Sequence, residues 1–237
     1  MYDNLHVEEM RKALGDRHEI TIRDIDDFYC RFSPDIPIST VRWRIHSLIN
    51  KGILQRTGYG RYRFDEKERF VPQVYLKTEK IACILERGFP YVDYCQWDFA
   101  VANSFAQHLF NIQLFFVDVE RDATEAVYRE IRDRYRNTVL YRNLSEELPY
   151  YDGCIVVRNL VSDSPIVDVD GLPMASIEKI LVDFALDRLF PFQNTELYHL
   201  YENALSSYAV NINRMLRYAG RRGRRDTIED VLNKIDY

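Results

Sequence analysis

In residues 39–64 a helix pattern is followed directly by a hairpin pattern. This order restricts the folds that the chain can adopt more than any other feature of the sequence. Apolar residues recur at helical spacing and fall on one face at about 100° per residue: Val41, Ile45, Leu48 and Ile49. Ser39 is a favourable N-cap, and Gly52 is a residue type expected just after a helix. The pattern therefore predicts an amphipathic helix from Ser39 to Gly52 that packs one face on a core.

A β-hairpin is predicted immediately after this helix. Two short segments, 53–56 and 61–64, flank the glycine-containing turn at 57–60. The side chains that can face the core are Leu54, Tyr62 and Phe64, whereas Arg61 and Arg63 alternate with them and face outward. We therefore expect a hairpin with an apolar inner face and a basic outer face.

Two further helices are predicted upstream. A short apolar stripe ends at Gly15, and Thr21 with Asp24 forms a capping-box pattern that begins a second helix. The segment 33–37 then breaks the chain before the third helix. Two helices, a third helix with a polar outer face and a basic hairpin follow one another in the order of a winged helix-turn-helix domain. We predict this domain over residues 1–69, with a charged linker at 65–69.

Charge is distributed unevenly along the chain. The formal net charge is −5, yet residues 39–64 hold six Lys/Arg and no Asp/Glu, while residues 1–38 hold five Lys/Arg and nine Asp/Glu. The field near a surface depends on the nearby charges, so this segregation predicts a local basic surface on an acidic protein. Trp43 lies on the polar outer face of the predicted third helix, which is uncommon on a surface without a partner. Together these features predict binding to double-stranded operator DNA, with the third helix in the major groove.

The predicted DNA-binding residues divide by chemistry into two groups. The polar side chains and the tryptophan would meet base edges, and the arginines and the lysine would meet phosphates. They are Ser39, Thr40, Arg42, Trp43, Arg44, His46, Ser47, Asn50, Lys51, Arg56, Arg61 and Arg63. Two other interpretations stay open from the sequence: the tryptophan packs against a neighbouring domain, or the charges form an ordinary solvated face.

Residues 70–237 predict a mixed α/β domain that ends in helices. Strands are predicted over 70–76, 91–95, 112–120, 138–141 and 154–158, with a hairpin around Asp170-Gly171, and helices over 78–87, 98–109 and 122–134. Further helices are predicted over 176–187, 195–207, 211–221 and 227–235. The expected fold class is α+β: an N-terminal winged helix-turn-helix, then a mixed α/β domain with a C-terminal helical bundle over about 176–237.

The candidate for catalytic chemistry is the pair Asp118 and Glu120, which ends the apolar stretch 112–120. Two carboxylates on one face of a strand can hold Mg²⁺, as in nucleotidyltransferases and nucleases. A nucleotidyltransferase also needs a Gly-Ser turn upstream, and 102–105 contains no glycine. A nuclease needs a lysine two residues after the second acid, where this chain has Asp122. We therefore expect no catalytic residue, no metal, no cofactor and no enzymatic activity.

A second basic segment lies near the C-terminus. The apolar residues of 211–221 form one stripe, and six arginines with no acid among them are predicted to lie outside it: Arg214, Arg217, Arg221, Arg222, Arg224 and Arg225. This patch is suited to nucleic acid or an acidic partner. The alternative is a solvated helix end that is stabilised by the helix dipole.

The sequence predicts a cytoplasmic protein without membrane contact. Its most apolar stretch, 112–119, is less than half the length that a bilayer span requires, and the first residues lack a signal-peptide pattern. The scattered cysteines Cys30, Cys83, Cys95 and Cys154 show no metal-ligand spacing, and we expect reduced, packed thiols.

Several segments resemble one family. Ala175–Asp183 (Ala-Ser-Ile-Glu-Lys-Ile-Leu-Val-Asp) resembles the Pro-Thr-x-Glu-Lys-Ile-Leu-Val-Asp signature of AbiEi-type antitoxins, with alanine in place of the usual proline. The segments 115–122, 198–208, 216–219 and 221–223 are similar to other parts of that family. The resemblance implies the antitoxin of a type IV toxin–antitoxin (abortive infection) pair, which represses its own promoter. It also implies a nucleotidyltransferase toxin as functional partner, without requiring a stable complex.

Three functions remain open from the sequence. The first is this DNA-binding antitoxin and autorepressor. The second is a winged-helix transcription regulator whose α/β domain senses a small molecule. The third is a metal-dependent nuclease or nucleotidyltransferase that uses Asp118 and Glu120.

Overall fold

A computed structural model describes residues 5–64, 67–143, 152–187, 189–190, 192 and 194–235. The chain is a mixed α+β protein that divides into two compact units. Unit 1 comprises Met1–Arg69 together with Ser207–Asn211, and unit 2 comprises Phe70–Ser206 together with Ile212–Tyr237. The short segment 207–211, far along the chain, thus joins the N-terminal residues in unit 1.

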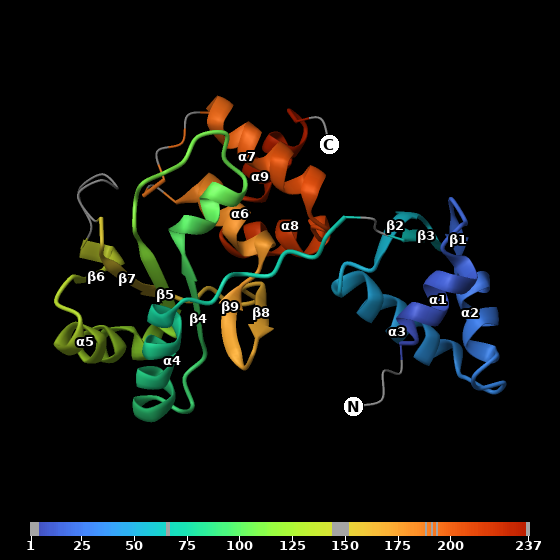
Figure 1. Ribbon diagram of the computed structural model, residues 1–237, viewed down its shortest axis with the longest axis horizontal. Coiled ribbons are helices and arrows are strands. Elements are labelled where there is room, and N and C mark those ends of the chain that lie inside the picture. Colours follow the sequence, from blue (N-terminus) through green and yellow to red (C-terminus); the bar gives the residue numbers. More distant parts are fainter. Residues whose placement is uncertain are drawn as a thin grey trace. The chain divides into compact units, whose positions relative to one another are not determined.

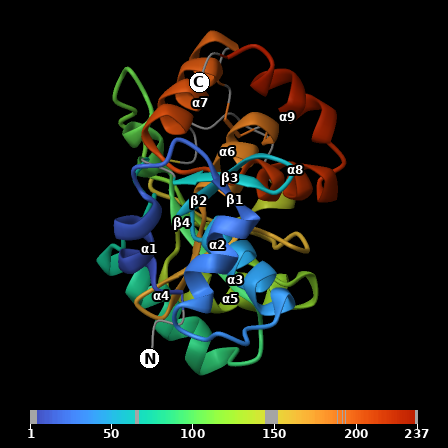
Figure 2. The same cartoon turned by 90° about the vertical axis from the view of Figure 1, so that its right-hand side faces the viewer.

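In its described residues, 5–64, 67–69 and 207–211, unit 1 has three helices and a three-stranded antiparallel sheet (Figure 1 and Figure 2). The elements are α1 (Val7–Leu14), β1 (Ile20–Thr21), α2 (Ile22–Cys30), α3 (Ile38–Asn50), β2 (Leu54–Gly58) and β3 (Arg61–Phe64). The strand order is β1-β3-β2, so the last strand lies between the other two.

Local signals in the sequence set the helix ends of unit 1. Thr21 and Asp24 form the predicted capping box at the start of α2. Gly52 has φ of +65°, and the amides of Gly52 and Ile53 donate to the carbonyls of Ile49 and Leu48, which is the Schellman arrangement. The predicted helix end at Gly52 is therefore confirmed.

The predicted N-cap of α3 is wrong by two residues. The helix begins at Ile38, and its N-cap is Pro37, whose extended backbone carries no side-chain cap. Ser39 therefore lies inside the first turn. Pro37 has no side-chain acceptor and takes part in the start of the helix only through its carbonyl, which accepts from the amides of Thr40 and Val41 at 2.9 and 3.2 Å.

The core of unit 1 lies between the helices and the inner face of the sheet. Met10, Ile25, Tyr29 and Val41 are fully buried there. The three predicted inward residues of the hairpin, Leu54, Tyr62 and Phe64, are buried in the same core. Their burial fixes the register of β3, and alternation along the strand turns Arg61 and Arg63 outward.

Unit 2 is built on a six-stranded mixed sheet with the strand order β6-β7-β5-β4-β9-β8. Its elements are α4 (Leu76–Gly88), β4 (Tyr94–Asp98), η1 (Phe99–Ser104), β5 (Phe115–Val119), η2 (Arg121–Ala123), α5 (Thr124–Arg134), β6 (Thr138–Leu140), η3 (Tyr141–Asn143), β7 (Ile155–Asn159), β8 (Ile166–Val169), β9 (Leu172–Ala175), α6 (Ile177–Leu186), α7 (Asn194–Ser207), α8 (Ile212–Arg221) and α9 (Arg225–Leu232). Strands β5, β6 and β7 are parallel, β4 is antiparallel to β5, and β8 and β9 form the predicted hairpin.

The two faces of the sheet in unit 2 differ in chemistry. One face carries Phe115, Val117 and Val119 of β5 and packs on apolar side chains of α4 and α5. The other face carries Phe116 and Asp118 of β5 and packs under α6. Every residue of β5 is buried, which confirms the prediction of a buried central strand.

Two predicted elements of unit 2 are wrong. Residues 70–75 form no strand; Pro72 lies among them and has no amide to donate to a ladder. The predicted helix at 98–109 is only the short 3₁₀ helix Phe99–Ser104. There the side chain of Asn103 exchanges two hydrogen bonds with the backbone of Phe110, at 2.7 and 3.1 Å, and this local pairing replaces helical continuation.

Across the described residues, the helices are too short or too polar to cross a lipid bilayer.

Candidate functional site

The face of α3 that points away from the core carries the predicted base-reading residues. Val41, Ile45 and Leu48 are buried on the inner side of the helix. On the opposite side Ser39, Trp43 and His46 are exposed, and the exposed fraction of Trp43 reaches 65%. We call this side of the helix, which also includes Arg42, the outer face of α3.

The other predicted residues of this helix lie elsewhere. Thr40 and Ser47 are half-buried and flank the outer face, and Lys51 is exposed just beyond the helix end. Arg44 is half-buried, with its guanidinium carbon 4.5 Å from the centre of the Tyr29 ring. This cation–π contact turns Arg44 toward the helices of unit 1 and away from the outer face. The side chain of Asn50 lies outside the described residues.

The hairpin presents the remaining predicted arginines. Both Arg61 and Arg63 are exposed. The Nη1 atom of Arg61 lies 3.0 Å from a carboxylate oxygen of Glu19. The Nε–H group of Arg63 donates to the side-chain oxygen of Gln55 over 2.8 Å. Arg56 lies over the ring of Tyr59 at 6.0 Å. Tyr59, at the tip of the hairpin, is 96% exposed and was not among the residues predicted from the sequence. Its signal was its place in the turn, beside Gly58 and Gly60.

Solvent weakens the ion pair between Arg61 of the hairpin and Glu19. Arg61 and Glu19 are both well exposed, and exposed pairs contribute about 0–1 kcal/mol. Arg61 can therefore exchange Glu19 for a phosphate at little cost in stability. Residues 39–64 contain no acid, so α3 and the hairpin themselves carry only basic charges, and the carboxylate beside Arg61 and Thr57 comes from Glu19.

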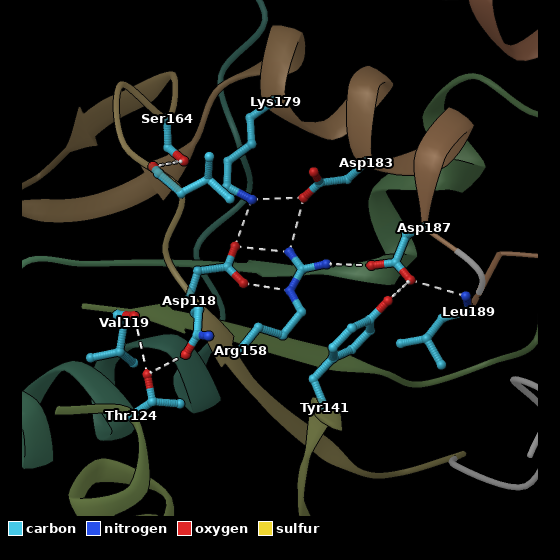
Figure 3. A network of polar contacts seen from close by, with 12 residues as sticks. Asp118, Val119, Thr124, Tyr141, Arg158, Ser164, Lys179, Asp183, Asp187 and Leu189 are labelled. Atoms are coloured by element: carbon cyan, nitrogen blue, oxygen red, sulfur yellow. Dashed lines mark hydrogen bonds and ion pairs between the residues drawn. The ribbon is translucent and has the colours of Figure 1, made fainter. Parts of the chain in front are cut away.

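Unit 2 contains a buried ionic network that joins its sheet to α6 (Figure 3). Asp118 of β5 and Arg158 of β7 stand on neighbouring strands and are paired through both carboxylate oxygens. Lys179 Nζ lies 2.6 Å from Asp118 and 2.7 Å from Asp183, one helical turn away on α6. Arg158 also reaches Asp183 at 2.9 Å and Asp187 at 2.8 Å.

The network is extended by groups from other elements. Tyr218 of α8 donates to Asp183 over 3.0 Å, and Arg222 pairs with the same carboxylate. Tyr141 donates to Asp187 over 3.0 Å. Asp118, Asp183 and Asp187 balance Arg158, Lys179 and Arg222, so this set of six has no net charge. Every carboxylate oxygen of the three aspartates receives at least one donor.

Burial and pairing act in opposite directions on the pKa values of the network. Burial alone would raise the pKa of Asp118 and of Asp183, but the charges of the surrounding cations outweigh it and lower both pKa values. Burial would lower the pKa of Lys179, and the two aspartates instead raise it. The three groups are therefore charged at neutral pH.

The arrangement of Asp118 does not suit a metal ion. Its oxygens are occupied by Arg158 and Lys179, while Glu120 is exposed beyond the end of β5. The described residues contain no cluster of three or more His, Cys, Asp or Glu that could hold a metal. The Asp118–Glu120 pair therefore does not converge on one site.

The predicted second basic patch is only partly present. Arg214 and Arg222 are half-buried and turned inward, so the prediction that all six arginines lie outside is wrong. Arg214 donates to the carbonyl of Ile166, and Arg222 reaches Asp183. Arg221 pairs with Asp163, and Arg225 with Glu229. Arg217 and Arg224 are exposed without such a pairing among the described residues.

Sequence reasoning missed the network as a whole and singled out two of its members for other roles, Asp118 as a metal ligand and Arg222 as part of an exposed basic patch. The available signal was Lys179 and Asp183, four residues apart in a segment whose other members are almost all apolar. A charged pair at that spacing in a helix buried on all sides must be buried too, and buried charges need partners.

Residues 40–237 match DUF6577, a family of unknown function, and the chain belongs to this family. The match begins inside α3 and takes in the hairpin and all of unit 2. No curated protein matches the chain.

Proposed function

We propose that the protein is a DNA-binding transcription repressor, and that it is the antitoxin and autorepressor of a type IV toxin–antitoxin operon. The outer face of α3 carries this proposal. A tryptophan, two polar side chains and an arginine stand there, in a segment, 39–64, that contains no acid.

The topology of unit 1 supports the first part. The order α1-β1-α2-α3-β2-β3, with the sheet order β1-β3-β2, is the order expected of a winged helix-turn-helix domain, and this agreement supports the proposal. In such domains the third helix enters the major groove and the hairpin, or wing, contacts the DNA backbone or the minor groove. The outer face of α3 would then meet base edges, and Arg61 and Arg63 would meet phosphates.

The antitoxin assignment is supported by the resemblance of 175–183 to the AbiEi signature. In unit 2 this segment forms the end of β9 and most of α6, and Lys179 and Asp183 of the signature belong to the buried network. The residues of the resemblance thus assemble the core of unit 2. Since Ile177–Phe184 are buried, we infer that any action on a toxin uses other surfaces. We also propose that the protein is not an enzyme, because the carboxylates of the network are saturated by cations.

A salt titration of DNA affinity tests the DNA-binding proposal. The full-length protein is titrated with the DNA upstream of its own reading frame and with a scrambled duplex. Removal of one phosphate contact should reduce the slope of log K against log salt by about 0.9. Arg61→Ala/Arg63→Ala should flatten this slope and leave the ratio of the two affinities largely intact. Arg217→Ala, an exposed arginine of unit 2, is the matched control and should change neither.

Substitutions in α3 should act in the opposite way. Removal of one base contact costs about 1–3 kcal/mol on the operator and much less on random DNA. Thr40→Ala and Ser47→Ala should therefore lower the ratio of operator to scrambled affinity. Wild-type protein that shows no salt-sensitive binding to either duplex would contradict the DNA-binding proposal. The antitoxin proposal is tested separately, by whether co-expression relieves the toxicity of a nucleotidyltransferase encoded beside it.

A second candidate function, small-molecule sensing by unit 2, is favoured by one observation. A cavity of about 290 Å³ lies beyond the carboxyl ends of the parallel strands β5, β6 and β7, and its lining includes Arg121, Thr124, Tyr141 and Arg142. Ligands of α/β sheets bind outside the carboxyl ends of the strands. A metabolite that binds saturably and shifts operator affinity, with the shift abolished in Arg121→Ala, would support this candidate.

A further inference from the structure

We infer that Trp43 selects a thymine in the bound DNA, through contact between its indole ring and the thymine C5-methyl group. The inference rests on the proposed DNA binding and adds the identity of a base. The indole is neutral, so attraction to phosphates cannot account for Trp43, and contact with a base gives it a role.

Trp43 lies in the middle of the outer face of α3, on the side of the helix opposite the core. Ser39, Trp43 and His46 follow one another at spacings of four and three residues and so share the outer face. Trp43 is the largest of them and is 65% exposed. Among the described residues, its indole makes no hydrogen bond and no ring contact. A large apolar ring is thus held in water at the centre of a polar surface, where burial against a ligand would stabilise it.

The chemistry of the major groove restricts what this ring can contact. The base edges there present hydrogen-bond donors, acceptors and a single apolar group, the C5-methyl of thymine. Beside that methyl group thymine presents the O4 acceptor, and the indole N–H is a donor only. Cytosine presents an amino donor at the corresponding position and no methyl group. Thymine therefore matches both parts of the indole, and cytosine matches neither.

The neighbours of Trp43 complete the argument by exclusion. Ser39, Arg42 and His46 offer polar or charged groups that suit acceptors on other bases and on phosphates. Each of them recognises a base chiefly through hydrogen bonds. The other apolar groups of α3 lie off the outer face, since Thr40 only flanks it and the 47% exposed Ile38 stands on another side of the helix. If α3 distinguishes thymine from the other pyrimidine, the outer face offers Trp43 for that purpose.

The experiment compares thymine with deoxyuridine, which differs only by the absent methyl group. The full-length protein first selects duplexes from a random-sequence pool, and the selected duplex is then resynthesised with single thymines replaced by deoxyuridine. Wild-type protein should lose about fourfold in affinity at one or two positions, the equivalent of about 0.8 kcal/mol for one buried CH₂-sized group. Trp43→Ala should bind the thymine and deoxyuridine duplexes equally at those positions. Arg42→Ala, on the adjacent residue, should weaken both duplexes and retain the fourfold ratio.

Each result has a separate meaning. Trp43→Ala that still prefers thymine, or wild-type protein that never distinguishes thymine from deoxyuridine, overturns the inference and leaves DNA binding intact. If Trp43 packs on a protein surface instead of on DNA, wild-type protein will not distinguish thymine from deoxyuridine. If no duplex is selected and binding shows no salt dependence, the proposed function itself fails. Because Trp43 is exposed, circular dichroism should show the same helix content in Trp43→Ala and wild type.

Discussion

Replacing Asp183 by asparagine removes one of the three negative charges from the buried network and keeps the shape of the side chain. Asp183 accepts from Lys179, Arg158, Tyr218 and Arg222. In Asp183→Asn the network changes from neutral to a charge of +1, and the cations share fewer acceptors in a site that water hardly reaches. We expect unit 2 to lose stability.

The magnitude follows from how deeply the partners are buried. Removing one member of a buried ion pair costs about 3–5 kcal/mol, because the remaining charge is left without compensation. Two features place Asp183→Asn near the lower end of that range. The amide keeps one acceptor oxygen, and the side chain of Arg222 is 20% exposed, so water can solvate part of the freed charge. The expected loss is therefore about 3 kcal/mol.

A matched control is available in the same unit. Asp163 pairs with Arg221 at 2.6 Å, but the two side chains are 48% and 54% exposed. This pair also joins a carboxylate to a guanidinium, but it is open to solvent and stands outside the buried network. Asp163→Asn should therefore cost no more than about 1 kcal/mol.

Urea unfolding can be followed for unit 2 alone. The chain has two tryptophans, of which Trp43 belongs to unit 1 and the buried Trp97 lies within 6.0 Å of Lys179. In a Trp43→Phe background the fluorescence change reports on Trp97 and so on the surroundings of the network. This avoids applying one two-state transition to a chain of two units.

A double substitution separates charge balance from the simple removal of hydrogen bonds. Lys179→Met alone leaves the network at −1 and should also cost about 3–5 kcal/mol. Lys179→Met/Asp183→Asn is neutral again, and we expect it to be about 1–3 kcal/mol less destabilising than the sum of the single variants. Strictly additive effects, or a loss in Asp183→Asn as small as in Asp163→Asn, would refute the account of the network as a balanced buried cluster.

Three further outcomes follow from local structure. Folding lowers the pKa of Asp183, so its ionised carboxylate stabilises the folded state fully above the unfolded pKa of about 3.9 and less as the pH falls below it. The difference in unfolding free energy between wild type and Asp183→Asn should therefore shrink in urea titrations below about pH 4. Arg44→Ala should destabilise unit 1 by about 0.5–1 kcal/mol in thermal unfolding with little loss of DNA affinity, and Arg42→Ala should do the reverse. Gly52→Ala should destabilise unit 1 by about 1–2 kcal/mol because φ is +65°, whereas Gly220→Ala, in a helix with open space around it, should not destabilise unit 2.

The parts of the fold that could be predicted from the sequence are those fixed by residues close together in the chain. The capping box at Thr21 and the left-handed Gly52 are each specified within a few residues. The alternation of Arg61, Tyr62 and Arg63 likewise identifies the outer side of the hairpin without knowledge of the partner strand. These local signals were enough to place the candidate DNA-binding surface.

The buried network could not be predicted in the same way. Asp118 and Arg158 meet because β5 and β7 are neighbours in one register, although 40 residues separate them in the chain. Read along the sequence, Asp118 stands beside Glu120 and suggests a metal site instead. Arg222 was expected on the exposed side of the helix for a similar reason. Its position just after α8 shows that it flanks the apolar stripe, but the sequence does not show that Asp183 of α6 lies close enough to pair with it.

Solvent access decides which charges of this protein can serve a ligand. Arg158 carries the same guanidinium group as Arg61, but it is buried, and any anion that bound it would have to displace aspartates from a closed network. Arg61 gives up only an exposed contact with Glu19, which is worth about 0–1 kcal/mol. A phosphate can therefore take the place of Glu19 with a net gain, whereas no comparable exchange is available at Arg158. For this reason we expect the salt dependence of DNA binding to follow substitutions in the hairpin and to be unchanged in Asp183→Asn protein that remains folded.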